Sequence, residues 1–155
     1  MKKIVKVAMV LFILFGLLGC TETKNGDVAT CTLTTDSGSV VTHKIYYEGE
    51  KATKIDIISQ ISISSNASKD AMLENVEKDN KELFGGSATS SIDTINGVDY
   101  LTTTYDLTHD DAHYMFEFYT FYKEVDVKNS DGTYSIEKII NALKAYELFE
   151  FTCDK

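Results

Sequence analysis

The sequence contains no proline, no tryptophan and no arginine, so all fifteen of its basic residues are lysines. Without arginine the chain has no planar guanidinium group to hold a phosphate or carboxylate through two parallel hydrogen bonds, which argues against a dedicated phosphoryl-transfer site. Acidic residues outnumber basic ones by 24 to 15, and the net charge is −9. Because a surface of that charge is repelled by nucleic acid and by anionic membrane surfaces, we expect no nucleic-acid partner.

Residues 1–19 have the pattern of a bacterial export signal, with Lys2, Lys3 and Lys6 ahead of an almost purely apolar run at 7–18. The run is shorter than the ~20 apolar residues of a membrane-spanning helix. It ends in Leu17-Leu18-Gly19-Cys20, which resembles a lipobox. The resemblance implies cleavage before Cys20, a diacylglycerol on its thiol and an N-acyl chain such as palmitate on its amino group. The alternative is an ordinary secretory signal with a chance cysteine.

Three regions follow from this interpretation. We expect a lipoprotein signal peptide at 1–19, a lipidated Cys20 with a polar tether at 20–29, and a single domain at 30–155. Loss of residues 1–19 removes three lysines and no acids, which changes the net charge from −9 to −12. The acyl chains, rather than the protein surface, would then hold the protein to the membrane, and we expect it in the cell envelope outside the cytoplasm.

Two cysteines, Cys31 and Cys153, remain near the two ends of the expected domain. Outside the reducing cytosol such a pair is expected to form a disulfide that ties the first strand to the last. The alternative is two buried free thiols. A metal site needs more ligands than this pair, and we expect no cofactor beyond the acyl chains on Cys20.

Alternating apolar residues predict strands, with turns near 36–38 and 48–50, and Asn96-Gly97 predicts a tight hairpin. Ser68 is a fitting N-cap for a helix to Phe84, with Leu73, Val76, Asn80 and Leu83 on its inward stripe and Gly85-Gly86 at its end. A second helix is expected from Ser135 to about Tyr146, before a closing strand that reaches Cys153. We therefore predict an α+β fold, an antiparallel β-sheet of about six strands with two helices packed on one face.

The order of these features resembles the YehR-like bacterial lipoproteins. The shared features are the lipobox, the short polar tether, the early hairpin "YYEGEKATK", the helix ending "KELFGG" and the closing helix and strand. The resemblance implies a small α+β lipoprotein domain from a family without an established activity. It carries over one functional residue, the lipidated Cys20.

The segment "HDDAH" at 109–113 is the densest cluster of potential metal ligands. At a hairpin tip, or on one helical turn, His109 and His113 would face the same way, with Asp110 or Asp111 as a third ligand for zinc. The zinc-protease motif is absent because no glutamate lies between the histidines at the catalytic position. The alternative is a solvated acidic turn. His43 shares a strand face with Val41 and Ile45, where we expect a hydrogen-bonded, partly buried role.

The aromatic segment "YMFEFYTFY" at 114–122 is predicted to be a strand that is apolar on both faces. It is either a central strand covered on both sides or one side of a groove for an apolar, peptide or glycan ligand. The predicted contact face consists of Tyr114, Phe116, Phe118 and Tyr122.

No catalytic motif is evident, and we expect a protein that is not an enzyme. "GGSAT" lacks the second glycine of a nucleophile elbow. The first hypothesis is a lipid-anchored cell-envelope domain that binds an unidentified envelope protein or a small ligand. The second is a metal-binding envelope lipoprotein that uses His109, Asp111 and His113.

Overall fold

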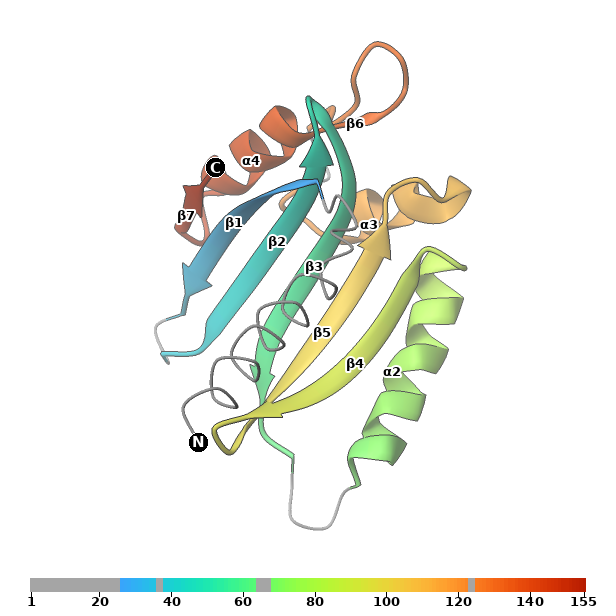
Figure 1. Ribbon diagram of the computed structural model, residues 1–155, viewed down its shortest axis with the longest axis vertical. Helices are drawn as coiled ribbons and strands as arrows, with labels where there is room; N and C mark the ends of the chain where they lie inside the picture. Colours follow the sequence, from blue (N-terminus) through green and yellow to red (C-terminus); the bar gives the residue numbers. More distant parts are fainter. Residues whose placement is uncertain (1–25, 36–37, 64–67, 123–124) are drawn as a thin grey trace, which may run out of the picture.

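The computed structural model describes residues 26–35, 38–63, 68–122 and 125–155. Seven strands in this part of the chain form a single antiparallel sheet in the order β4-β5-β3-β2-β1-β7, with the short β6 paired to β3 (Figure 1). This confirms the α+β fold. The strands are β1 (Asp27–Thr34), β2 (Val40–Glu48), β3 (Lys51–Ile61), β4 (Ala88–Ile95), β5 (Val98–Asp106), β6 (Tyr134–Ser135) and β7 (Phe151–Asp154).

Three α-helices and one 3-10 turn accompany the sheet in the described ranges, one helix more than expected. They are α2 (Lys69–Phe84), the 3-10 turn η1 (Asp110–Ala112), α3 (His113–Phe118) and α4 (Ile136–Lys144). The hydrophobic core lies between the helices and one face of the sheet, to which alternate residues such as Cys31, Ile45 and Ile55 contribute fully buried side chains. From α4, Ile136, Ile139 and Leu143 fill the same core. Helix α2 runs beside the edge strand β4.

The hairpin turns follow from residue types that tolerate a positive φ. Asn96 and Gly97 have φ angles of 52° and 81° and connect β4 to β5 directly, as the sequence predicts. Two consecutive residues with positive φ form the turn whose twist matches that of the flanking strands. The β1–β2 and β2–β3 connections also fall where the sequence places turns, although residues 36–37 lie outside the described part.

Helix α2 begins where predicted, and of the four residues on its predicted inward stripe Leu73 and Val76 are half-buried and Asn80 is buried. Ser68 Oγ accepts a hydrogen bond from the Ala71 amide at 3.0 Å and so caps the helix. Leu83, also predicted to face inward, is instead 45% exposed, and the adjacent Phe84 is buried. The Asn80 side-chain amide donates a hydrogen bond to Ser90 Oγ of β4 at 2.8 Å, which connects this face of α2 to the sheet.

The predicted strand at 114–122 is wrong, because residues 113–118 form α3 and residues 119–122 form an irregular turn. The buried side chains around α3 are Ala112, Met115 and Phe116, with Tyr119 half-buried behind them. Counted from Ala112, these residues follow at three, four and seven positions, the spacing of one face of a helix. A helix therefore buries them together, and this burial outweighs the strand propensity of the aromatic residues. The backbone of residues 113–118 forms hydrogen bonds within the helix instead of hydrogen bonds to a neighbouring strand.

Both ends of the domain differ slightly from expectation. Strand β1 begins at Asp27, so the last three residues expected in the tether belong to the sheet, and Ala29 is fully buried. Helix α4 begins directly after Ser135, whose side chain caps it, and ends at Lys144, two residues before the predicted end. The disulfide between Cys31 and Cys153 is present, and these residues are directly opposite each other in β1 and β7.

The predicted signal peptide at 1–19 and the predicted lipidation site at Cys20 lie outside the described residues. Within the described ranges, no helix combines the length and apolar character required to cross a lipid bilayer.

Candidate functional site

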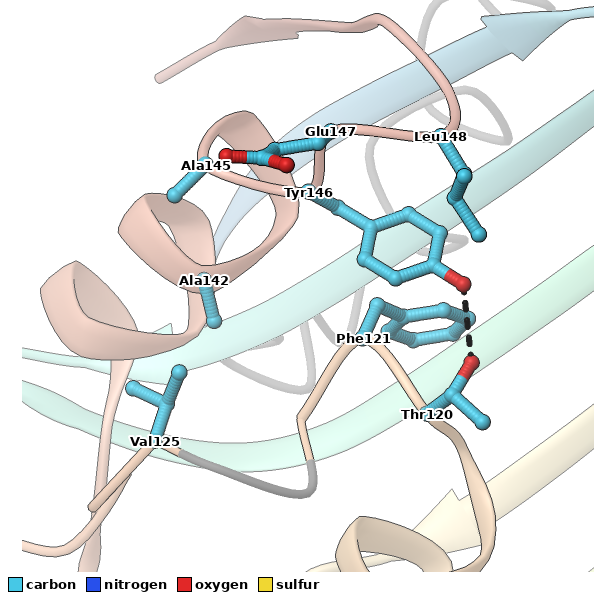
Figure 2. A pocket seen from close by; sticks show the side chains of 8 residues that line it. All are labelled: Thr120, Phe121, Val125, Ala142, Ala145, Tyr146, Glu147 and Leu148. Carbon is cyan, nitrogen blue, oxygen red and sulfur yellow. Dashed lines mark hydrogen bonds between the residues drawn. The ribbon is translucent and has the colours of Figure 1, made fainter.

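An apolar groove lies between the turn that follows α3 and the segment that follows α4 (Figure 2). Its volume is about 680 Å³. The aromatic rings of Phe121 and Tyr146 meet edge to face in it, with their centroids 5.8 Å apart. The Tyr146 hydroxyl and Thr120 Oγ1 are hydrogen-bonded at 2.9 Å, which joins the two walls. The lining residues are Thr120, Phe121, Val125, Ala142, Ala145, Tyr146, Glu147 and Leu148.

Large apolar side chains gather in an exposed position at this groove. Leu148 is 74% exposed, Phe149 is 46% exposed and Val125 is 40% exposed. They lie on irregular segments rather than on a helix or strand with an inward face, so the local chain does not bury them. Exposed apolar residues that are grouped around a concave site are typical of a binding surface.

Acidic residues accompany these apolar side chains. Glu147 lines the groove, and Glu150 lies on the other side of Leu148 and Phe149 in the chain. Both glutamates are exposed. Since the chain as a whole is acidic as well, a partner segment with positive charges on either side of an apolar centre is electrostatically complementary to this site.

The structure divides the predicted contact face of Tyr114, Phe116, Phe118 and Tyr122. Tyr114 and Phe118 are exposed by 42% and 53%, whereas Phe116 and Tyr122 are buried. The four residues would share a face only if the segment were a strand, in which side chains alternate between two faces. Residues 113–118 form a helix, so Tyr114 and Phe118, one helical turn apart, share an exposed face instead. The groove is built by Thr120 and Phe121 of the same aromatic segment together with residues 142–148, whose role the sequence analysis missed. The apolar residues in "YELFE" at 146–150, which lie between helix α4 and the short β7, were the available signal.

A cluster of buried tyrosines supports the aromatic wall from behind. The hydroxyl groups of Tyr105 and Tyr119 are hydrogen-bonded at 2.8 Å. Burial raises the pKa of Tyr105, Tyr119 and Tyr122 above the ordinary value. The Tyr122 hydroxyl has no hydrogen-bond partner in the described part of the chain. These phenols therefore stay protonated at physiological pH and act through packing.

His43 lies in the core behind the groove rather than in a hydrogen-bonded position. Its ring meets the rings of Phe121 and Phe151 edge to face at centroid distances of 5.5 and 5.3 Å. It is only 2% exposed, and its Nδ1 atom has no hydrogen-bond partner among the described residues. Burial lowers the pKa of His43 from 6.5 to about 4, so the imidazole is neutral at pH 7.

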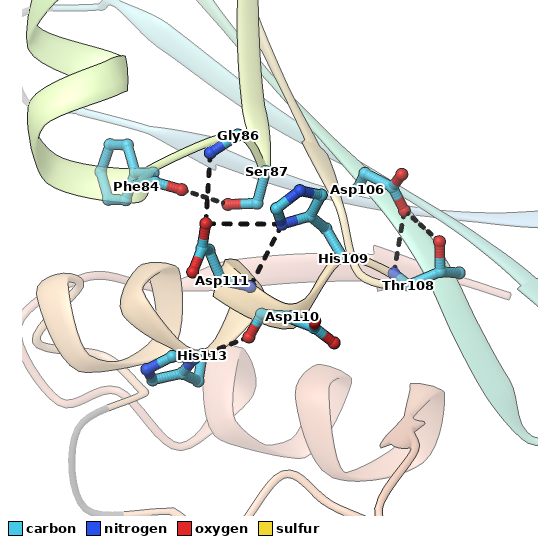
Figure 3. A network of polar contacts seen from close by, with 9 residues as sticks. All are labelled: Phe84, Gly86, Ser87, Asp106, Thr108, His109, Asp110, Asp111 and His113. Atoms are coloured by element: carbon cyan, nitrogen blue, oxygen red, sulfur yellow. Dashed lines mark hydrogen bonds and ion pairs between the residues drawn. The ribbon is translucent and has the colours of Figure 1, made fainter.

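The second candidate site, the "HDDAH" segment, is a structural turn in which the two histidines have different partners (Figure 3). His109 Nδ1 accepts a hydrogen bond from the Asp111 amide at 3.2 Å and caps η1. His113 Nδ1 is instead 3.0 Å from the Asp110 carbonyl oxygen, and its ring lies against Tyr114. The structure thus brings His109 and Asp111 together and turns His113 away from them.

Among the described residues, no group of three histidine, cysteine, aspartate or glutamate side chains is arranged to hold a metal ion. Metal binding through His109, Asp111 and His113 stays a prediction, and it would require the His109 and His113 rings to leave the hydrogen bonds described above.

The turn at Gly85-Gly86 is packed closely against this segment. The Asp111 carboxylate accepts a hydrogen bond from the Gly86 amide at 3.3 Å. A Cβ atom added at Gly85, where φ is 62°, would overlap that carboxylate. The segment at 106–113 is thereby fixed against the end of α2.

Replacement of Gly85 with alanine is expected to lower the free energy of unfolding by ~2 kcal/mol, because the positive φ is strained and the Asp111 carboxylate is displaced. Urea unfolding followed by tyrosine fluorescence measures this change. Gly38→Ala is the matched control, since Gly38 also has a positive φ of 80° but no atom within 4 Å of the added Cβ. An equal loss in the two variants would mean that the packing against Asp111 contributes nothing.

Taken together, these features define a two-layer α+β domain with one sheet, helices over a single core face and an apolar groove at its C-terminal end. The same fold is found in the NMR structure of the YehR protein of Escherichia coli. The two structures superpose with a TM-score of 0.50 over 85% of this chain and 94% of that chain, at 14% sequence identity. The similarity shows the fold alone. No protein-family model matches the chain, and no curated protein matches it in sequence.

Proposed function

We propose that this protein is a lipid-anchored, non-enzymatic domain of the cell envelope that binds a protein segment in the groove formed by Phe121, Tyr146 and Leu148. The observation that carries the proposal is the group of exposed apolar side chains around a concave site, with Leu148 74% exposed at its rim. Because Glu147 and Glu150 flank these side chains, the bound segment has an apolar centre between lysines or arginines.

The size and openness of the site favour a segment of a few residues over a small cofactor. The groove has an aromatic wall and an exposed leucine, Leu148, at its rim. A site of this kind can bury two or three apolar side chains of a partner. Such limited burial gives weak binding, with a Kd of ~10–100 µM, after the cost of ordering the partner is included. A tether to the membrane would offset the weak affinity when the partner is in the same envelope, because it confines both to one surface.

Binding of synthetic peptides to the full-length chain, purified from membranes in mild detergent, tests this function. A fluorescent peptide with a Leu-Phe centre and flanking lysines is compared by anisotropy with the same centre between glutamates. We expect the lysine-flanked peptide to bind at least ~10-fold more tightly, because like charges weaken the other complex. Equal affinities, or no binding of either peptide at millimolar concentration, would contradict the proposal.

The variant Leu148→Ser is expected to weaken binding of the lysine-flanked peptide by ~10-fold, since a buried leucine contributes ~1.5–3 kcal/mol. Leu83→Ser is the matched control, because Leu83 is also exposed and lies on α2 away from the groove.

The double variant Glu147→Lys/Glu150→Lys should weaken binding of the lysine-flanked peptide further. Its control, Glu74→Lys/Glu82→Lys, changes the net charge by the same amount on α2 and should leave binding unchanged.

The lipid anchor is tested separately through Cys20. The resemblance of residues 17–20 to a lipobox supports a diacylglycerol and an N-acyl chain on this cysteine. In a bacterial host supplied with labelled palmitate, we expect the wild-type chain to incorporate label and to sediment with membranes after cleavage before Cys20. The Cys20→Ser variant should incorporate no label. Labelling of Cys20→Ser, or an unlabelled wild type, would remove the anchor from the proposal.

A further inference from the structure

The Cys31–Cys153 bridge is the centre of a row of three side chains that crosses the sheet on its core face. Cys31 of β1 is register-paired with His43 of β2 on one side and with Cys153 of β7 on the other. Side chains that are directly opposite each other in antiparallel strands have Cβ atoms ~4.5–5.5 Å apart, so each member of the row lies beside the next. The two ends of the row differ sharply in their surroundings.

The outer end, at Cys153, is accessible. In the described sheet β7 is an edge strand that pairs only with β1, through four residues. Cys153 is half-buried and lines an opening of about 180 Å³ beside α4, whereas Cys31 is fully buried. An external thiol can therefore approach Cys153 but not Cys31.

Two lysines surround this opening in an otherwise acidic protein. Lys144 at the end of α4 and Lys155 both line it, accompanied by a single acid, Glu137. A thiolate is the species that attacks a disulfide, and positive charge near the target sulfur attracts it and stabilises the charge on the reacting sulfurs. The opening at Cys153 is thus suited to an anionic sulfur nucleophile.

The inner end of the row, at His43, supplies a hydrogen-bonding group that no other described residue uses. Its Nδ1 atom is buried and has no partner among the described residues. Buried polar atoms without partners are rare, and each costs ~1–3 kcal/mol. His43 is the register partner of Cys31, whose sulfur leaves when Cys153 is attacked, and in the tautomer with its proton on Nδ1 it carries a donor that makes no hydrogen bond to the intact bridge.

We propose that the Cys31–Cys153 bridge is a site of reversible thiol–disulfide exchange that an external thiolate opens by attack on Cys153 Sγ. The new S–S bond forms between the incoming sulfur and Cys153 as the Cys31–Cys153 bond breaks. Cys31 Sγ keeps the electron pair, accepts a hydrogen bond from His43 and ends as a thiol with the proton that the incoming thiol lost. A second thiol of the reductant, a dithiol, then releases Cys153 as a thiol and leaves the reductant as a disulfide. This proposal is independent of what the apolar groove binds.

To test the direction of attack, the full-length folded chain is treated with glutathione, the exchange is quenched with acid, and the chain is then unfolded so that N-ethylmaleimide can alkylate the buried Cys31. Cleavage after lysine separates the two cysteines into the peptides 25–44 and 145–155. We expect glutathione on 145–155 and the alkyl group on 25–44, in at least ~10-fold excess over the reverse pattern. The reverse pattern, an even mixture, or adducts that form only after unfolding in urea would each overturn the proposal.

Two sets of variants test the roles of the flanking groups. Lys144→Glu/Lys155→Glu should slow the reaction with anionic glutathione by ~3–10-fold at low salt and should affect the neutral thiol 2-mercaptoethanol less. Lys78→Glu/Lys81→Glu on α2 is the control of equal charge and should react at the wild-type rate. His43→Leu should slow both thiols alike, with folding verified by circular dichroism. If His43→Leu does not fold, the peptide that carries glutathione and the rate of the Lys144→Glu/Lys155→Glu variant still test the proposal. A wild-type rate in the lysine variant would contradict the role of the two positive charges.

Discussion

The double variant Cys31→Ala/Cys153→Ala is expected to lose ~4–5 kcal/mol of the free energy of unfolding, the value of the chain-entropy model for a loop of this length. The two cysteines are 122 residues apart, so the bridge restricts almost the whole unfolded domain. It also holds β7 to the sheet, where only four residue pairs with β1 are available. Because small domains have only ~5–15 kcal/mol of stability in total, this is a large share of it.

Urea unfolding of the oxidised wild type and the double variant measures the loss, followed by tyrosine fluorescence because the chain has no tryptophan. Wild-type protein reduced by a phosphine is the control that keeps both sulfur atoms in place. If the loss arises from the cross-link, the reduced wild type and the double variant should agree within ~1 kcal/mol, the size of a small packing defect. A double variant as stable as the oxidised wild type would show that the bridge contributes little.

Acidification from pH 6.5 to pH 4 is expected to destabilise the domain by about 3 kcal/mol through His43 alone. Burial lowers the pKa of this histidine from 6.5 to about 4 in the folded state. Between these two values the unfolded chain binds a proton that the folded chain does not, so stability falls as the pH falls. Above pH 6.5 the effect is absent, since the imidazole is neutral in both states. Each unit of pKa difference corresponds to ~1.4 kcal/mol.

The free energy of unfolding at half-unit intervals of pH isolates this contribution when wild type is compared with His43→Leu. The variant removes the titrating group and keeps an apolar side chain of similar size between Phe121 and Phe151. Carboxylates titrate equally in both proteins, so the difference between the two curves belongs to His43. Parallel curves for wild type and His43→Leu would rule out the buried histidine as the source.

The strands and their turns could be predicted from local patterns in the sequence. Asn96 and Gly97 have few alternatives to a tight hairpin, and the alternation around Ile55 and Ile57 fixes which face of β3 is buried. Ser68 and Ser135 mark the starts of α2 and α4 because each side chain caps a helical amide. These signals are local, so they survive without knowledge of the tertiary structure.

The features that could not be predicted depend on contacts between distant residues. In the segment 113–118 strand propensity and helical period disagree, and the decision rests on Met115 and Phe116 reaching the core together. The exposure of Leu83 beside the buried Phe84 depends on how α2 packs against β4, to which Asn80 is hydrogen-bonded through Ser90. The unpaired Nδ1 of His43 depends on which rings surround it.

Only part of the candidate site could be predicted from the sequence, again because the rest depends on contacts between distant residues. The aromatic segment supplies one wall of the groove through Phe121, but a sequence cannot show that the residues after α4 form the other wall. The pair His109 and His113 has suitable spacing for a metal, yet the cap on η1 and the Asp110 carbonyl give each ring a different orientation. Spacing along the chain alone does not fix the direction of a side chain in an irregular turn.

Photocrosslinking from residue 148 in the living host cell tests the central claim, that the groove holds a protein segment, most directly. Leu148 is replaced with p-benzoylphenylalanine, Leu83 is replaced in the same way as a control, and the crosslinked peptide is identified by mass spectrometry. The account predicts one crosslinked segment from position 148 that has an apolar centre between lysines or arginines and is lost in the Glu147→Lys/Glu150→Lys background. The absence of a crosslink at 148, the same product from position 83, or a segment that is acidic and polar would contradict it.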